Sequence, residues 1–260
     1  MAGPAADEEG QAEAGARNEE KAWLALALGW VAGFVDGVGY ITLYHLFTAH
    51  MSGNSVGLGV DIGQGHWLDA LHRVTPIIVY VVGVGVGAAL IEAGYRRGIR
   101  ATASAVLAVE AVALLLVITL GSGHLTGQQA DTRTGGIFYL LAALLAGAMG
   151  LQSATLRRVS GRTVRTNFVT GILTNLAEDL VVVALTRRRK RTAETGAAMR
   201  RAGLLSGIWV TYLVGAIVGA VLDFQWRLEA LALPLTVLAV VIVVDLARPF
   251  QPSLPAAGQE

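Results

Sequence analysis

Two acidic residues of this 260-residue sequence lie inside strongly apolar stretches. Asp36 stands within Gly33-Phe-Val-Asp36-Gly37, and Glu110 is surrounded by alanine, valine and leucine. If these stretches cross a membrane, each carboxylate costs at least ~2.5–3.5 kcal/mol to insert, so both should face the bundle interior or water. They are candidates to carry a proton, bind a cation or hold a polar solute. The structural alternative is a protonated acid that is hydrogen-bonded to a neighbouring helix.

Two short polar turns are candidate ligand contacts. They combine glycine with hydroxyl, amide or imidazole side chains: His50, Ser52, Gly53 and Asn54 in the first turn, and Thr170, Gly171 and Asn175 in the second. Glycine permits close backbone approach, and the polar side chains supply hydrogen bonds. Helix N-caps would explain the same residue types without a ligand. Gln152 and Asn167 are further polar candidates.

Several kinds of chemistry are excluded by the residues present. The chain has no cysteine, which removes thiolate metal sites and cysteine nucleophiles. It also lacks H-E-x-x-H, G-x-S-x-G and the Walker A pattern. We therefore expect no metal, no cofactor and no enzymatic activity.

The elements that must position these residues are membrane spans. Of the residues, 54% are hydrophobic and only 15% charged, against about 25% charged in average soluble domains. Six apolar runs approach the ~20 residues that a bilayer core requires: 23–45, 74–94, 101–120, 135–156, 202–222 and 228–247. They form one transmembrane domain, 21–247, between tails at 1–20 and 248–260 that we expect to be disordered because they lack a large apolar surface.

Two further segments, 48–63 and 166–186, are too polar to be ordinary spans. If neither crosses and the N-terminus is cytoplasmic, 17 of the 20 Lys and Arg residues lie inside, as expected from the positive-inside rule. If both cross, the count falls to 12 inside and 8 outside. The sequence thus predicts an all-α polytopic protein with six transmembrane helices and two re-entrant or broken helices, and both termini in the cytoplasm.

The two halves of the chain resemble each other. Both odd segments contain T-x-x-x-[ST]-G, and nine residues past the Ser or Thr each has an aspartate, Asp61 or Asp179, which solvation would explain. With three spans in each half, repeat one (23–120) and repeat two (135–247) must be inverted relative to each other. A 3+3 inverted repeat with broken helices is typical of transporters whose site lies near mid-membrane.

Glycines and basic residues suggest partners other than a solute. Gly29, Gly33 and Gly37, and a second ladder from Gly203 to Gly219, have the four-residue spacing of close helix packing, within a protomer or in a homo-oligomer. The run Arg187–Arg191 adjoins a predicted span. It is therefore expected to contact anionic lipid of the bilayer, and no nucleic-acid partner is expected.

Gly33-Phe34-Val35-Asp36, followed by Phe47-Thr-Ala-His50-Met51-Ser52-Gly53-Asn54, resembles the hallmark of the YoaK-like family. The stretch Gly147-Ala-Met-Gly150-Leu-Gln152, then Thr166 and Thr170-Gly171, is similar to its later motif. The usual form is H-M-T-G-N; here Ser52 replaces the threonine and keeps the hydroxyl. The resemblance covers about residues 23–247 and implies a bacterial inner-membrane protein whose domain has no established function.

The leading functional hypothesis is a small secondary transporter or permease for a small solute or ion. Asp36, with Glu110, would couple transport to protons, and the two polar turns would contact the solute. The alternative is a non-transporting scaffold or regulator that binds partners through the glycine ladders and basic loops.

Overall fold

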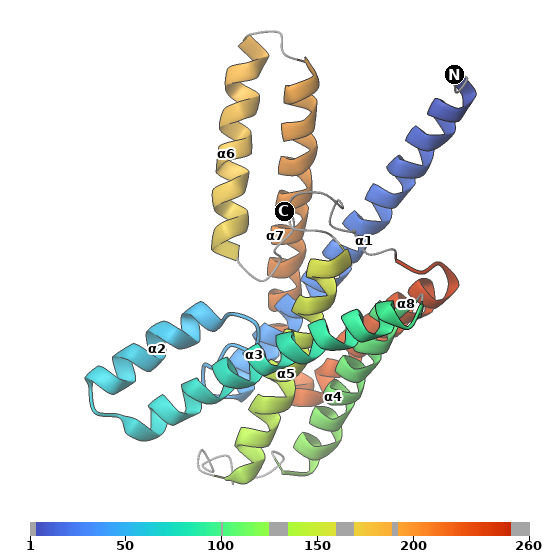
Figure 1. Ribbon diagram of the computed structural model, residues 1–260. Helices are drawn as coiled ribbons and strands as arrows, with labels where there is room; N and C mark the ends of the chain where they lie inside the picture. The colour runs from blue at the N-terminus through green and yellow to red at the C-terminus, as the bar shows by residue number, and fades with distance from the viewer. Residues whose placement is uncertain (1–3, 100, 125–134, 160–168, 189–191, 251–260) are drawn as a thin grey trace.

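The computed structural model describes residues 4–99, 101–124, 135–159, 169–188 and 192–250, and these ranges are helical without a strand. In chain order the elements are α1 (Pro4–Thr42), α2 (Met51–Gly63), α3 (Trp67–Arg96), α4 (Thr102–His124), α5 (Gly136–Val159), α6 (Val169–Arg188), α7 (Thr192–Trp226), the 3-10 turn η1 (Arg227–Leu231) and α8 (Ala232–Ala247). Figure 1 shows α1, α4, α5 and α8 packed together, with α3 crossing beside α5 and the lower part of α7 beside α1, while α2 and α6 lie away from this bundle.

Six stretches are long and apolar enough to cross a membrane: Glu19–Thr42, Trp67–Arg96, Thr102–Gly121, Gly136–Arg157, Val169–Thr186 and Thr195–Ala247. The last contains α7, η1 and α8, which the sequence predicts as two spans. The prediction of an all-α polytopic membrane protein is confirmed. Val169–Thr186 has the length and apolarity of a span, while the 13-residue α2 does not. That both return to their starting side stays a prediction.

α1 already begins at Pro4, so it includes most of the segment that the sequence predicts as an N-terminal tail. The segment is rich in alanine and glutamate, which are strong helix formers, and a first-position proline is compatible with a helix. Because the following span already forms a helix, extending it toward the N-terminus avoids the unfavourable free energy of helix nucleation. At the other end, Phe250 is buried and its amide donates to Oδ1 of Asp245 over 2.7 Å, so the predicted tail is anchored in its first residues.

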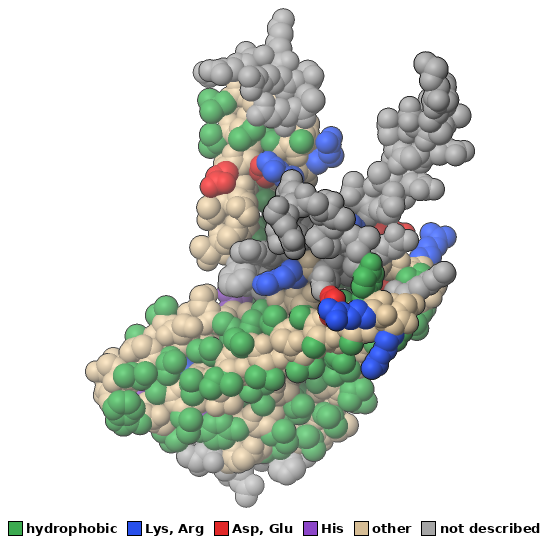
Figure 2. Space-filling view, viewed as in Figure 1, with side chains coloured by type: hydrophobic (Ala, Val, Ile, Leu, Met, Phe, Trp, Pro, Cys, Tyr) green, Lys and Arg blue, Asp and Glu red, His purple; other side chains and the backbone are tan. Residues whose placement is uncertain are grey.

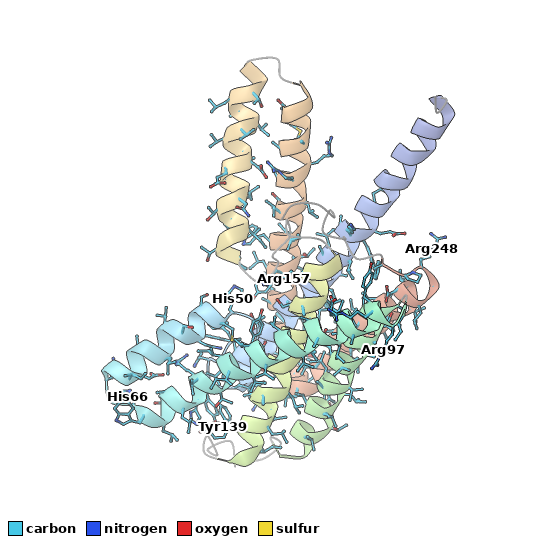
Figure 3. The ribbon with its side chains drawn as sticks, viewed as in Figure 1. His50, His66, Arg97, Tyr139, Arg157 and Arg248 are labelled. Atoms are coloured by element: carbon cyan, nitrogen blue, oxygen red, sulfur yellow. The ribbon has the colours of Figure 1, made fainter. Side chains whose placement is uncertain are left out.

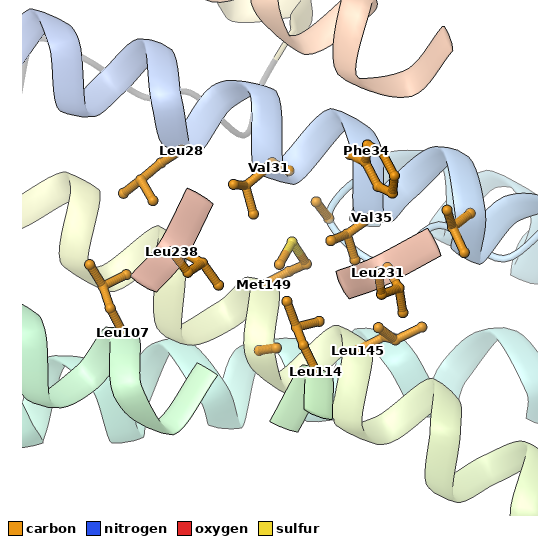
Figure 4. Packing of buried hydrophobic residues seen from close by; sticks show 14 of the residues in the cluster. Leu28, Val31, Phe34, Val35, Leu107, Leu114, Leu145, Met149, Leu231 and Leu238 are labelled. Atoms are coloured by element: carbon orange, nitrogen blue, oxygen red, sulfur yellow. The ribbon is translucent and has the colours of Figure 1, made fainter. Parts of the chain in front are cut away.

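The apolar core lies where α1, α4, α5 and α8 meet (Figure 4). Leu28 and Val35 of α1 face Met149 and Leu145 of α5, and Leu114 of α4 closes the layer from below in that view. Along this layer the residue numbers rise on α1 and fall on α5, so the two helices run in opposite directions. The outer surface is also apolar: Figure 2 shows hydrophobic side chains over the lower face, as expected for contact with lipid tails.

Residues predicted to lie on opposite sides of the membrane are separated in the structure. Figure 3 shows Arg157, Arg97 and Arg248 at the centre and right of the view, and His66 and Tyr139 at the lower left and bottom, on the other side of the bundle. The charge pattern predicts the three arginines on the cytoplasmic side and the other two residues outside. The arrangement agrees with that division, while the orientation in the membrane stays a prediction.

Glycines bring α1 and α7 into backbone contact. A Cβ at Gly33 would collide with the carbonyl of Tyr212, and one at Gly37 would lie 2.6 Å from the carbonyl oxygen of Ala216. From the other side, a Cβ at Gly215 would collide with the carbonyl of Trp30. The predicted role of these glycines in helix packing is therefore confirmed within one chain, except at Gly203, where a Cβ would meet nothing within 4 Å.

Glycines also bring the backbones of α3 and α5 into contact. A Cβ at Gly83 would lie 2.5 Å from the carbonyl oxygen of Gly147, and one at Gly150 would collide with the carbonyl of Tyr80. The first helix of each predicted repeat thus packs closely on the third helix of the other repeat. Reciprocal packing of this kind is expected if the two repeats are related by pseudo-symmetry. That the repeats are inverted stays a prediction.

The third helices also share a motif that the sequence reasoning missed. Residues 80–90 of α3 and 212–222 of α7 both read Y-x-V-G-x-x-V-G-A-x-L. The glycines of this motif are those that meet α5 and α1. Searching for self-similarity beyond the polar turns would have found it.

Candidate functional site

The candidate site forms around Asp36, in the interior of α1. After α1 ends at Thr42, Tyr44 and His45 adopt positive φ angles of 52° and 65°, a conformation that non-glycine residues rarely adopt. This turn reverses the chain, so that the loop before α2 runs back along α1. It brings residues 48–50 to the carboxylate of Asp36.

One oxygen of Asp36 binds the loop. Its Oδ1 accepts hydrogen bonds from the amide of Thr48 at 2.6 Å, from the hydroxyl of Thr48 at 2.8 Å and from the amide of Ala49 at 2.7 Å. All of these groups are buried. The carboxylate therefore takes the role of an anchor for the backbone that leads into α2.

The other oxygen joins α2 to α7. Oδ2 lies 3.0 Å from Nδ1 of His50 and 2.7 Å from the hydroxyl of Tyr212, which itself lies 2.9 Å from the same Nδ1. An ionised carboxylate only accepts hydrogen bonds, so Nδ1 of neutral His50 carries the hydrogen and its Nε2 is left as a basic lone pair. Three elements, α1, the start of α2 and α7, thus meet at one carboxylate.

Exposure differs sharply within this cluster. Asp36 is only 3% exposed, whereas the side chain of His50 is 21% exposed. The His50 ring lies between Phe47 and Tyr212, with centroid distances of 5.9 and 5.2 Å. Figure 3 places His50 at the start of α2, beside the bundle. His50 and the half-buried Tyr212 are therefore more accessible to a proton or a solute than Asp36, which positions the His50 ring.

Two residues of the first polar turn, Gly53 and Asn54, contact the preceding loop. Asn54 is buried and its amide makes a reciprocal pair with Phe47, donating to the carbonyl at 2.7 Å and accepting from the amide at 3.0 Å. A Cβ at Gly53 would lie 2.7 Å from the Phe47 ring. Ser52 is exposed in the first turn of α2. Of these predicted site residues, Ser52 is the one open to a ligand, and Asn54 and Gly53 hold the loop.

The second polar turn is separate from the first in its contacts. Thr170 and Asn175 are exposed on α6, and Gly171 is half-buried. Among the described residues α6 packs on α7 and on no other helix. Asn167 lies outside the described residues. The structure thus does not bring the second turn to the Asp36 cluster.

Glu110 and Gln152 are buried in the core away from that cluster. Nε2 of Gln152 donates to the carbonyl of Leu28 at 2.7 Å. Within the described part of the chain, Oε1 of Gln152 and both carboxyl oxygens of Glu110 have no hydrogen-bond partner. An uncompensated charge at such a place costs several kcal/mol, so Glu110 is a site that a proton or a cation would satisfy.

The repeat-related aspartates form ion pairs, which corrects the expectation that solvation explains them. Asp61 of α2 accepts from Nε of Arg73 at 2.7 Å, and Asp179 of α6 accepts from Arg201 at 2.5 Å. Both aspartates are buried. Each pair fastens one hairpin, α2–α3 or α6–α7.

Sequence reasoning missed three polar residues that matter here: Thr48, Tyr212 and Asp245. The repeated Y-x-V-G motif would have singled out Tyr212. Asp245, in the last span, accepts from the amide of Ser104 at 2.8 Å and from its hydroxyl. In the part of the chain that the structure describes, no group of three His, Cys, Asp or Glu side chains could hold a metal ion.

Comparisons with known proteins give a family and one relative. The model of the family described as "Protein of unknown function (DUF1275)" matches residues 24–244. The "UPF0700 transmembrane protein YoaK" of Bacillus subtilis (strain 168) is 26% identical over 192 residues, which cover 74% of this chain and 79% of that relative. No solved structure matches the chain.

Proposed function

The chain belongs to the DUF1275 family, and we propose that it is a secondary transporter of a small solute or ion in the bacterial inner membrane, coupled to protons. The observation that carries this proposal is the cluster of Asp36, His50 and Tyr212, whose hydrogen bonds join α1, α2 and α7. An intramembrane acid is a functional candidate because a merely structural role is met at lower cost by apolar packing.

Proton coupling would act through Nε2 of His50. When this nitrogen takes up a proton, the ring becomes a cation that is paired with Asp36 over 3.0 Å. The altered charge lies where the loop before α2 meets α7, so it would change the relative stability of two arrangements of these elements. A ligand shifts such an equilibrium only by its differential affinity for the two states; protonation of His50 supplies that difference.

The solute would bind near the first turn of α2. Ser52 is exposed there, and a helix start offers free backbone N–H groups with a positive partial charge. Thr170 and Asn175 hold the corresponding positions of the second repeat on α6, which among the described helices packs on α7 alone, so they do not contribute to this site. Glu110, buried without a described hydrogen-bond partner, is a second place for a proton or a cation.

The exchanged packing of the halves supports a transport mechanism. α1 lies against α7 through Gly33, and α5 lies against α3 through Gly150. Two interlocked repeats can rock against each other about such close crossings, which is how many transporters alternate access to a central site.

The test uses proteoliposomes that contain a pH-sensitive dye and have an imposed pH gradient. A panel of small polar solutes is added outside, and the rate of internal pH change is measured. We expect a solute-dependent proton flux that falls by an order of magnitude or more in Asp36→Asn and His50→Gln. His66→Gln, at an exposed histidine of the α2–α3 turn, is the matched control.

Unchanged flux in Asp36→Asn and His50→Gln would remove the coupling role of the cluster. Absence of any solute-dependent flux in folded wild-type protein, together with a partner that co-purifies through the basic loops, would favour the scaffold alternative instead.

A further inference from the structure

A groove lies between the two helices of the α6–α7 hairpin, away from the Asp36 cluster. It has a volume of about 390 Å³ and is lined by Val182 of α6 and by Ala197, Ala198, Arg200 and Arg201 of α7. A cavity of this size is in the range of small-molecule sites, which are mostly apolar with a few placed polar groups.

Polar contacts hold the hairpin together on either side of the groove. Toward the start of α6, Asp179 binds Arg201. Toward its end, the hydroxyl of Thr195 donates to that of Thr186 at 2.7 Å. Val182 lies between these contacts along α6. The apolar walls are thus fixed in place by the flanking bonds.

The two arginines that line the groove differ in whether they form an ion pair. Arg201 is compensated by Asp179, whereas Arg200 is exposed and has no ion pair among the described residues. On this hairpin, Figure 2 shows basic side chains on the α7 side and an acidic side chain at the far edge of α6. An exposed arginine without an ion pair in the described part of the chain, beside an apolar wall, matches a phosphate group attached to an apolar chain.

We propose that this groove binds the phosphate headgroup and first acyl carbons of an anionic phospholipid of the cytoplasmic leaflet. Arg200 contacts the phosphate, and Val182, Ala197 and Ala198 contact the acyl chain. The positive-inside distribution places this hairpin end on the cytoplasmic side, where basic pockets between membrane helices bind anionic headgroups. The source of the phosphate is a lipid, because a free phosphate would leave the apolar wall unused.

The experiment is native mass spectrometry of the full-length protein in detergent, with added phosphatidylglycerol or phosphatidylcholine. We expect retained adducts of phosphatidylglycerol to exceed those of phosphatidylcholine. Arg200→Gln should lower phosphatidylglycerol retention about fivefold, the factor expected for one arginine contact with an anionic surface. Ala197→Phe should lower it as well, because it fills the groove and keeps both arginines.

The matched control is Arg97→Gln, an exposed arginine at the end of α3 that is predicted to face the same leaflet. It should leave lipid retention unchanged, and a melting curve of each variant confirms that it is folded. Equal retention of both lipids, or an equal loss in Arg97→Gln, would overturn the proposal. Displacement of phosphatidylglycerol by millimolar inorganic phosphate would overturn the lipid as the source.

Discussion

Tyr212 donates its hydroxyl hydrogen to Asp36 across 2.7 Å, although 176 residues separate them in the sequence. The bond links the third helix of the second half to the first helix of the first half. It lies one helical turn from the backbone contact between Gly33 and Tyr212. The polar cluster and the closest helix crossing of α1 are therefore parts of the same junction, so a change in one must affect the other.

The hydroxyl of Tyr212 is expected to stabilise this junction. Tyr212→Phe keeps the ring and removes one donor from a buried carboxylate, which costs ~1–3 kcal/mol. Reversible unfolding by SDS in mixed micelles measures this loss. Tyr95→Phe, at an exposed tyrosine of α3, is the control. Equal stability of Tyr212→Phe and wild type would show that this hydrogen bond does not contribute to the free energy of unfolding.

Replacing a glycine of α1 by alanine is expected to change stability in the opposite direction from the same replacement at a glycine that faces open space. Gly33→Ala places a Cβ against the backbone of Tyr212, and overpacking of this kind costs about 1–3 kcal/mol or more. Gly203→Ala meets nothing within 4 Å and should stabilise α7 by roughly 0.5–1 kcal/mol, since alanine is the better helix former. The two melting temperatures should move in opposite directions. A shift in the same direction for both would contradict the close crossing.

The paired charges of the two hairpins are expected to be coupled within each hairpin and independent between them. Double-mutant cycles with Asp61→Asn and Arg73→Gln, and with Asp179→Asn and Arg201→Gln, should each give a coupling of ~0.5–3 kcal/mol. A cycle that combines Asp61→Asn with Arg201→Gln should give none. Additive effects within a hairpin would mean that the ion pair does not form in the membrane.

Asn54 and Ser52 are expected to act differently although they are neighbours in one turn. Asn54→Ala breaks both hydrogen bonds to Phe47 and should expose the loop 43–50 to proteolysis. Ser52→Ala removes an exposed hydroxyl, so it should leave proteolysis unchanged and reduce solute-dependent flux. If Ser52→Ala also opened the loop, its hydroxyl would have a structural role instead of contacting the solute.

The membrane class and most of the spans could be predicted from the sequence, because apolar length and the side preference of arginine are strong signals. Asp36 and His50 could also be singled out, since an acid in an apolar helix and a polar turn are conspicuous. Their direct contact could not be predicted. It depends on the left-handed turn at Tyr44 and His45, for which a glycine would have been the usual marker.

The roles of other residues required the packing of distant helices. Asn54 looks like a ligand group in sequence, yet its amide is used by Phe47, seven residues earlier. The partners of Asp61 and Asp179 could not be read from spacing, because Arg73 lies 12 residues away and Arg201 lies 22 residues away.

The two halves are predicted to be inverted relative to each other, with the α2–α3 turn outside and the α6–α7 turn in the cytoplasm. The chain has no native cysteine, so single cysteines at Gln64 and at Gly196 can be labelled in intact cells with a membrane-impermeant maleimide. This inversion predicts labelling of Gln64→Cys in intact cells, and of Gly196→Cys only after the membrane is opened. Labelling of both positions from the same side would contradict it.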